Sequence, residues 1–549
     1  MLPTLALLVA GPLAHADVVV VDFVDGTSLD EARVRADLPA LEWVHPLSAD
    51  ESLGMAEVSD VDEAIARISA LPGVESAERT IRMEALGYPD DPLYGRQWNL
   101  AAIGAPAGWR VGGGAGVTVA VIDTGVSRVA DLADTELLDG ASFVAGEPGW
   151  SDGNGHGTHV AGTIAQSTDN GIGVAGVAPH ARVLPIKALS AQGFGMSPWI
   201  ASAIDEAADR GAQVINLSLG GSYSKVIATA VEKAQDRGVL VIAAAGNSGR
   251  EGVGYPAALP GVLAVSAVGP DDALAPYSSW GAQVGISAPG GDKRKTDGGI
   301  LQDTVDGEGG HAFKELQGTS MASPHVAGAA AVLLSATGGD VARTRALLEG
   351  TARDLGPAGP DPRFGHGRLD LAAAVRRLVV QQQGILFGLG GAAALLLAGL
   401  GGTAATRRSR TLVTVAAGAI AAGGLFFLPL LPLPPSPVTA LLSRPIALWP
   451  AALLPDPYWR NPLLLSAALP FLATFVLGPT RSLGPVVAGL CAGVAVSFGH
   501  AAVMGGLVVW PLPAAASTAW LALNAVLTAL CAIAAIGVAR LRDKEEARP

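Results

Sequence analysis

Cysteine is almost absent from this chain. Its only two, Cys491 and Cys531, lie in apolar runs near the C-terminal end, and the first 383 residues contain none. A disulfide framework is therefore excluded for the part of the chain that reads as globular, so a large core or a bound metal must supply its stability. The simplest interpretation of the two cysteines is that they are small apolar residues in membrane helices.

Charged residues are also scarce, at 15%, whereas half of all residues are apolar. The apolar excess lies after about Gln383, where long runs with few charges favour membrane segments. The whole chain has a net charge of −13, and the part from Gly384 onward holds ten basic and four acidic residues, so residues 1–383 carry −19. An acidic globular part argues against nucleic acid as a partner.

The first 16 residues have the pattern of a secretory signal peptide. An apolar run ends in Ala14-His15-Ala16, which fits the small-x-small cleavage pattern, although no Lys or Arg precedes the run. Residues 17–86 then alternate strand-like and helix-like stretches in the order β-α-β-β-α-β. That order is typical of a ferredoxin-like α/β unit and carries no function by itself.

Residues 87–378 read as one larger α/β domain. Nearly continuous apolar strands, such as 117–122, 183–187 and 239–244, alternate with helical stretches such as 198–210. This alternation predicts a parallel sheet covered by helices on both faces. Sites in such folds lie beyond the carboxyl ends of the strands.

Four motifs fall at those places. A strand ends in Asp123-Thr124-Gly125, a Gly-rich loop presents His156 at a helix start, Asn247 follows another strand, and Gly318-Thr319-Ser320 opens a further helix. A serine hydroxyl needs a neighbouring base, an imidazole is suited to that role, and a buried carboxylate orients the imidazole. A helix N-terminus and a side-chain amide can donate to a developing oxyanion.

Together these segments resemble the subtilisin-like (subtilase) family of serine peptidases, over about residues 89–377. The resemblance implies that Asp123 is the orienting carboxylate, His156 the general base, Asn247 the oxyanion donor and Ser320 the nucleophile of an endopeptidase. It also implies that residues 17–86 are an inhibitor-type propeptide that occupies the cleft until self-cleavage between about Met83 and Tyr88, with Leu86 as the preferred P1 residue.

The same resemblance implies a substrate site and a calcium site. Ser218, Leu219 and Gly220 match the strand that pairs with an extended polypeptide, and Gly254 matches an open pocket floor that admits large apolar P1 side chains. The calcium ligands implied are two carboxylates, one amide oxygen and three backbone carbonyls: Asp91, Asp131, Asn170, Thr168, Ile172 and Val174. The alternative for this loop is a tight Gly-rich turn with no metal. Residues 292–315 look like a surface insertion without a role.

The C-terminal region predicts about five membrane helices, at 384–402, 411–433, 463–479, 484–510 and 515–538. Arginines and lysines at 407–410, 481 and 540–544 place those loops on the cytoplasmic side, so the expected location is a multi-pass cell-membrane protein. The same distribution predicts that the peptidase is extracytoplasmic and the C-terminus is cytoplasmic. The lipid bilayer is then a partner of the protein. His500 and Asn524 are polar at membrane depth, and either function or helix packing explains such residues.

Two alternatives to a broadly acting, anchored peptidase stay open. One is a membrane transport or signalling protein whose outer domain senses or processes one peptide. The other is a processing enzyme with a single physiological substrate, although an open pocket argues against narrow selectivity.

Overall fold

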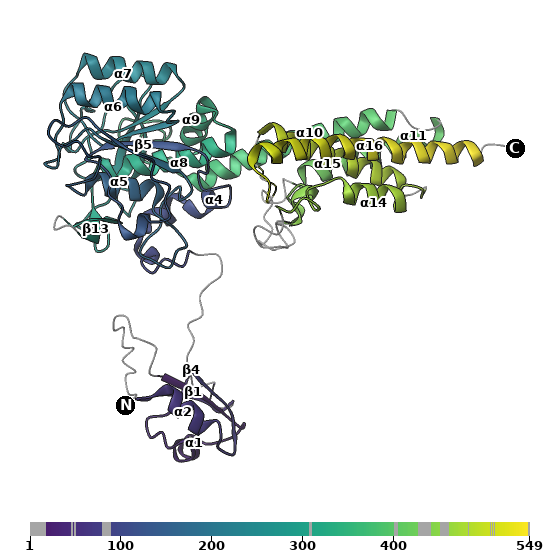
Figure 1. Ribbon diagram of the computed structural model, residues 1–549, viewed down its shortest axis with the longest axis horizontal. Coiled ribbons are helices and arrows are strands. Elements are labelled where there is room, and N and C mark those ends of the chain that lie inside the picture. Colours follow the sequence, from purple (N-terminus) through teal and green to yellow (C-terminus); the bar gives the residue numbers. More distant parts are fainter. Residues whose placement is uncertain are drawn as a thin grey trace. The chain divides into compact units, whose positions relative to one another are not determined.

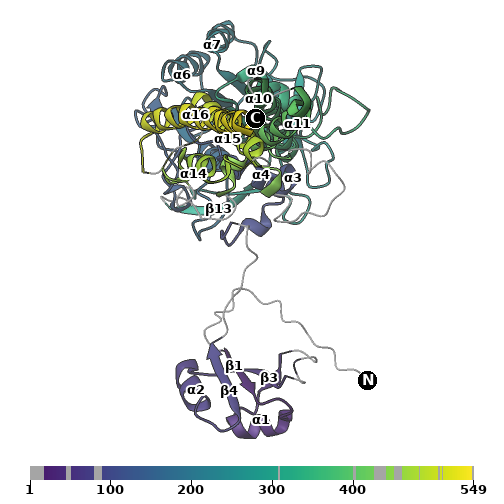
Figure 2. The ribbon, with the colours of Figure 1, turned by 90° about the vertical axis from the view of Figure 1, so that its right-hand side faces the viewer.

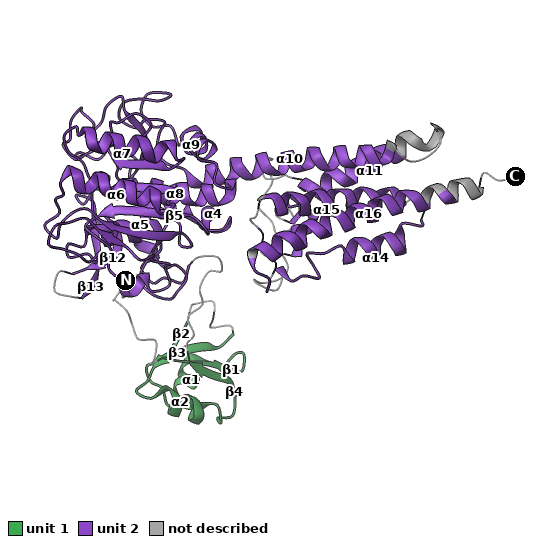
Figure 3. Ribbon diagram, turned by 45° about the horizontal axis from the view of Figure 1, so that its top comes forward, with its two compact units in different colours: residues 1–88 green, residues 89–549 purple. Residues whose placement is uncertain are grey.

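The computed structural model forms two compact units, residues 1–88 and 89–549, coloured separately in Figure 3. It describes residues 18–44, 48, 51–79, 89–306, 310–399, 404–425, 441–450, 460–480, 483–504, 507, 509 and 511–546. The predicted signal peptide, the predicted cleavage site at 83–88 and Arg481 lie outside the described residues.

The first unit is a four-stranded antiparallel sheet with two helices. Its elements are β1 (Val18–Phe23), α1 (Leu29–Ala36), β2 (Glu42–Trp43), β3 (Leu53–Glu57), α2 (Val61–Ile68) and β4 (Val74–Arg79). The strand order β2-β3-β1-β4 confirms the predicted ferredoxin-like arrangement. Alternate residues of β1, namely Val19, Val21 and Phe23, face the helices and are fully buried, which is why this polar-rich segment folds as a unit.

The second unit contains a seven-stranded parallel sheet in the order β11-β10-β9-β8-β5-β7-β6. Its strands are β5 (Thr118–Asp123), β6 (Ala141–Ser142), β7 (Arg182–Lys187), β8 (Val214–Leu217), β9 (Leu240–Ala244), β10 (Leu263–Val268) and β11 (Val284–Pro289). Around it lie α3 (Trp98–Ile103), α4 (Ala105–Trp109), α5 (His156–Ala165), α6 (Ser197–Asp209), α7 (Lys225–Asp236), α8 (Thr319–Thr337) and α9 (Val341–Gly350).

Both faces of this sheet are buried, as the apolar strands predict. Along β5, Val119 and Val121 belong to a core shared with α5 and α8, whereas Ala120 and Ile122 belong to a second core shared with α6 and α7. Side chains along a strand alternate between faces, so one continuous apolar strand supplies both cores. Figure 1 shows α6 and α7 together on one side of the sheet.

The C-terminal region is all-helical in its described parts. Its helices are α10 (Leu371–Gly399), α11 (Ala404–Gly423), α14 (Ala468–Leu477), α15 (Gly484–Met504) and α16 (Ala514–Glu546). Among the described residues, three stretches are long and apolar enough to cross a membrane: Leu371–Ala398, Gly484–Val503 and Ala515–Val538. The predicted segments at 411–433 and 463–479 contain shorter apolar helices, Arg410–Gly423 and Ala468–Leu477. Figure 2 looks along these helices and shows them as one bundle.

The prediction of a surface insertion at 292–315 is wrong for its middle part. Residues Ile300–Val305 (β12) and His311–Leu316 (β13) form an antiparallel hairpin. The first of these strands is buried, with Gln302 and Asp303 fully inaccessible, because it packs against α5. The polar composition of the segment suggested exposure, but Asp303 and Thr304 are hydrogen-bonded inside the fold.

Candidate active site

Four elements bring the motif residues to one edge of the sheet. Asp123 is the last residue of β5, His156 the first of α5, and Ser320 the second of α8, while Asn247 follows β9. The strands are parallel, so their carboxyl ends meet at the same edge and the loops that follow them converge there. His156 and Ser320 line one cleft.

Asp123 and His156 form a direct pair. His156 Nδ1 lies 2.7 Å from Asp123 Oδ1, which also accepts the Thr124 backbone N–H at 2.8 Å. Asp123 is fully buried, whereas a quarter of the His156 side chain stays exposed toward the cleft. Burial lowers the pKa of His156, but the charge and hydrogen bond of Asp123, together with the charge of Asp152, outweigh it, so the pKa lies above its ordinary value.

Asp152 holds the loop that presents His156, a role that motif reasoning missed. Its Oδ1 accepts the Gly155 N–H at 2.9 Å and the Thr124 hydroxyl at 2.9 Å, and its Oδ2 accepts the Thr158 N–H at 2.9 Å. It therefore caps the start of α5 and ties it to the end of β5. An Asp shortly before a helix start is the sequence signal that could have identified it.

The Gly-rich motif allows this loop and strand to approach closely. A Cβ on Gly157 would clash with the carbonyl oxygen of Gly125, just beyond Asp123. Gly155, immediately before α5, has a φ of +96°, a left-handed conformation that favours glycine. Both glycines thus allow Asp123 and His156 to lie close together.

Ser320 and Asn247 meet at the start of α8. Asn247 Oδ1 accepts the Thr319 N–H at 2.9 Å and the Thr319 hydroxyl at 3.0 Å, which turns the amide nitrogen the other way. A Cβ placed on Gly318 would lie 3.5 Å from Asn247 Nδ2 and 3.6 Å from the Ser320 backbone nitrogen. The same point lies 3.7 Å from Asn247 Oδ1, so the Asn247 amide and the Ser320 backbone nitrogen both lie close to Gly318, beside the serine. The Ser320 hydroxyl donates to the Ser218 carbonyl oxygen at 3.2 Å.

The cleft has two hollows that share the segment 219–221 and Ser320. One, of 540 Å³, is lined by His156 and Ser218 and by apolar residues that include Phe194. The other, of 300 Å³, is lined by Asn247, Gly254 and the segment 244–246. The structure thus places the four residues predicted for substrate binding, Ser218, Leu219, Gly220 and Gly254, around the same serine.

The predicted calcium ligands also lie together. Asp91 Oδ2 accepts the Asp169 N–H at 2.9 Å, and Asp131 Oδ2 accepts the Val174 N–H at 2.9 Å. Asn170 links the two acids: its N–H donates to Asp91 at 3.4 Å and its Nδ2 donates to Asp131 at 3.1 Å. Both carboxylates are buried in one loop cluster.

This cluster has the chemistry of a cation site built on oxygen. Burial, with the charges of Asp91 and Asp303, raises the pKa of Asp131 to about 7 despite its hydrogen bonds to Val174 and Asn170. The carbonyl oxygens of Thr168 and Ile172 accept no hydrogen bond from any described residue. Within the described part of the chain, no three His, Cys, Asp or Glu side chains form a metal cluster, so a hard cation here would depend on amide and carbonyl oxygens as well.

Two other histidines in these motifs lie inside α5 and α8 and are bonded within the fold. His159 is fully buried with Nε2 2.9 Å from the Ile300 carbonyl oxygen, and His325 is fully buried with Nδ1 2.7 Å from the Met321 carbonyl oxygen. Burial lowers the pKa of His159 to about 3 and that of His325 to about 4, so both are neutral at pH 7.

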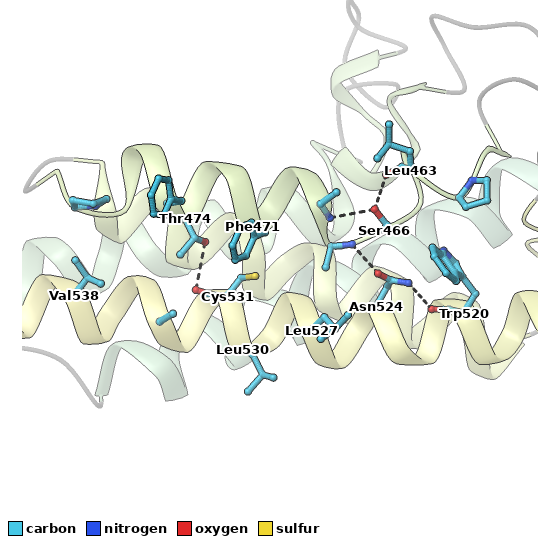
Figure 4. Close-up of a pocket in the computed structure, with 16 residues that line it drawn as sticks. Leu463, Ser466, Phe471, Thr474, Trp520, Asn524, Leu527, Leu530, Cys531 and Val538 are labelled. Carbon is cyan, nitrogen blue, oxygen red and sulfur yellow. Dashed lines mark hydrogen bonds between the residues drawn. The ribbon is translucent and has the colours of Figure 1, made fainter.

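In the C-terminal helices the polar Asn524 is engaged internally. Its Oδ1 accepts the Ala467 N–H at 2.9 Å and its Nδ2 donates to the Trp520 carbonyl oxygen at 2.9 Å, as Figure 4 shows. An apolar groove of 1120 Å³ lies beside it between α14 and α16. Asn524 therefore ties the start of α14 to α16, which supports the packing interpretation over a functional one.

Comparison with known proteins identifies the family of this chain. The sequence profile of the subtilase family matches residues 114–367. An "Alkaline protease" of Alkalihalobacillus alcalophilus is 39% identical over 342 residues, which is 62% of this chain and 81% of that protein. "Subtilisin BL" of Lederbergia lenta is 43% identical over 282 residues, 51% of this chain and 98% of that protein.

A solved protease from Pseudoalteromonas arctica matches 53% of this chain and 99% of its own, with 33% identity and a TM-score of 0.49. The match to the alkaline protease covers four fifths of that relative at 39% identity. The chain therefore belongs to the subtilase family and is a subtilisin-like serine endopeptidase.

Proposed function

We propose that Ser320 attacks the scissile carbonyl, that His156 takes the serine proton and returns it to the leaving amine, and that Asp123 orients His156 and stabilises its charged form. The observation that carries this assignment is the 2.7 Å contact between a fully buried carboxylate and an imidazole that lines the cleft together with Ser320. The Ser320–Ser218 hydrogen bond must be exchanged for one to His156 when substrate enters the cleft.

Asn247 Nδ2 and the Ser320 backbone N–H supply the oxyanion donors in this mechanism. They flank the same spot beside Gly318, and the hydrogen bonds from Thr319 hold the amide in the orientation that presents Nδ2. Donors that are already oriented stabilise the developing charge without reorganising during the reaction. The first turn of α8 adds the positive end of its dipole.

The substrate is an extended polypeptide with a large apolar side chain at P1. Main-chain pairing along Ser218–Gly220 gives affinity with little sequence selectivity. At Gly254 an added Cβ would meet its nearest neighbours, two carbonyl oxygens, only at 3.7 and 3.9 Å, so the glycine leaves space in the smaller hollow that a side chain would fill. This supports broad specificity over a single physiological substrate.

Calcium is the structural cation proposed for the loop around Asp131. Asp91 and Asp131 supply carboxylate oxygens, Asn170 its amide oxygen, and Thr168, Ile172 and Val174 their carbonyl oxygens. A cation of this kind supplies the positive charge that two buried acids lack. It stabilises the loop and takes no part in the reaction.

The C-terminal helices anchor the enzyme in a cell membrane with the peptidase on the outer side and the C-terminus in the cytoplasm. Three stretches long and apolar enough to span support the anchor, and the Arg and Lys residues at 540–544, which follow the last of these stretches within α16, support the orientation. Residues 17–86, folded as a separate small unit, are the propeptide that inhibits the cleft until it is cut. The internal bonding of Asn524 weighs against a transport or sensing protein.

Mass spectrometry of the N-terminus tests the catalytic assignment. Wild-type protein expressed in membranes should begin near Gly87, whereas Ser320→Ala should retain residues 17–86. If both begin at the same residue, self-cleavage by Ser320 is wrong, and hydrolysis of a soluble peptide by each protein then decides whether Ser320 is the nucleophile at all.

A further inference from the structure

One unbroken helix joins the peptidase to the C-terminal helices. The first turns of α10 belong to the peptidase core, where Leu371, Ala374 and Leu378 are buried. The first candidate span, Leu371–Ala398, is part of the same helix, so it includes these core residues and continues beyond them. Because no loop separates the two parts, the peptidase is held at a set distance from the apolar stretch that begins near Gly384.

The attachment point lies at the end of α8 that is remote from the catalytic serine. Gln382 Nε2 donates to the Ala336 carbonyl oxygen at 2.9 Å. Earlier in α10, Leu371 lies against Gly108 together with Val332 of α8. Both helices therefore advance toward the same end, and α10 leaves the peptidase in the direction away from Ser320.

The lengths of α8 and β5 give the separation between the catalytic serine and the point where α10 is attached. Ser320 and Ala336 are sixteen residues apart on α8, which at 1.5 Å per residue is about 24 Å. The Ser335 hydroxyl donates at 2.8 Å to the carbonyl oxygen of Ala115, just before β5 begins, whereas Asp123 lies at the far end of that strand, about 17 Å away. The membrane helix thus leaves near the amino edge of the sheet, and the cleft opens at the carboxyl edge.

The cleft is also built without the C-terminal region. Its two hollows are lined by residues from 124 to 320, and among the described residues none from α10 onward contributes to either. Substrate contacts and membrane attachment are therefore at opposite ends of the peptidase.

We propose that this enzyme cleaves polypeptides whose scissile bond stands well clear of the bilayer, namely soluble chains or long extracellular segments, and spares peptide bonds close to a membrane-spanning helix. The inference rests on the proposed function, since it requires an active and anchored peptidase. About seven fully extended residues are needed to cover 24 Å, and a tether of about four residues reaches at most about 14 Å.

The test uses the full chain in lipid vesicles with substrates that share one cleavable segment. One substrate is a soluble peptide, and two are fused to a single membrane-spanning helix through Gly/Ser tethers of about four and about 25 residues, the longer having a root-mean-square span near 25–30 Å. We expect similar cleavage of the soluble and long-tether substrates and at least about tenfold slower cleavage of the short-tether substrate, because a tether that cannot span gives almost no effective concentration.

A variant of the enzyme separates the effect of distance from any effect of the amino-acid sequence of the short tether. Inserting about 20 Gly/Ser residues between Gln383 and Gly384 frees the peptidase from its fixed distance while retaining the Gln382–Ala336 contact. This variant should cleave the soluble peptide as wild type does and recover cleavage of the short-tether substrate. Equal wild-type cleavage of both tethered substrates, or no recovery after the insertion, overturns the inference. Failure to cut the soluble peptide overturns the proposed function itself, and the inference with it.

Discussion

A polar residue of the peptidase region, Asn247, and one of the C-terminal helices, Asn524, differ in how their side-chain amides are hydrogen-bonded. In the peptidase, Asn247 is held by one end, so its amide nitrogen stays oriented beside Ser320. In the C-terminal helices, Asn524 uses both ends of its amide on neighbouring backbone. Polar groups whose hydrogen bonds all lie within the fold stabilise it. A group that is held in place but keeps an N–H donor can use that donor to bind a ligand. This difference supports the chemistry proposed for the first region and the anchoring role proposed for the second.

The largest expected effect compares one residue from each region. Ser320→Ala should lower peptide hydrolysis by at least about 10³-fold, because the nucleophile is lost. Asn524→Ala should leave hydrolysis of a soluble peptide unchanged and lower the stability of the helical region by about 1 kcal/mol. Kinetics on a soluble peptide and thermal unfolding in detergent measure the two effects. A comparable loss of activity in Asn524→Ala would contradict the purely structural role given to Asn524.

Removing the oriented donor should have the next largest effect. Asn247→Ala should lower kcat by about 10²–10³-fold with little change in KM, because the lost hydrogen bond forms only as the oxyanion develops. Steady-state kinetics measure this split. A rise in KM with kcat unchanged would instead place Asn247 in substrate binding.

Calcium should matter to the peptidase region alone. At a calcium concentration about 100 times the dissociation constant, binding stabilises the folded protein by about 2.7 kcal/mol, so chelation should lower its unfolding temperature. Asp131→Asn should abolish this response, while Asp271→Asn, an exposed acid outside the loop, should retain it. A chelator response that persists in Asp131→Asn would place the cation elsewhere.

A smaller effect is expected at the pocket floor. Gly254→Val should lower kcat/KM for substrates with Leu or Phe at P1 by about tenfold relative to Ala at P1, because the added side chain fills the smaller hollow. Matched peptides that differ only at P1 measure the ratio. An unchanged ratio would show that Gly254 does not form the P1 pocket.

The smallest expected effect is the position of the acid limb in the pH profile. His156 accepts a proton only when neutral, and its pKa is raised, so the protonated and inactive form persists to higher pH. The limb of kcat/KM should therefore have its midpoint above 6.5, the ordinary value for histidine. A midpoint below that value would mean that burial outweighs Asp123.

Much of the chemistry could be predicted from the order of residues along the chain. Apolar periodicity identified the parallel sheet, and the motifs around Asp123, His156 and Ser320 lie where that sheet's carboxyl edge requires them. The prediction that failed was that of a surface insertion at 292–315, because the polar residues there suggested exposure although β12 is buried. Composition cannot distinguish a polar residue that faces water from one that is bonded inside the fold.

The sequence by itself determined the family, the motif residues and the apolar C-terminal stretches, because these depend on local order along the chain. Only the tertiary structure gave the geometry of the expected Asp123–His156 pair, the capping role of Asp152, the burial of β12 and the bonding of Asn524. It alone placed Ser320 at one end of α8 and the contact between Gln382 of α10 and Ala336 near the other end. These relations join residues distant in the chain, and they depend on packing that no local pattern encodes.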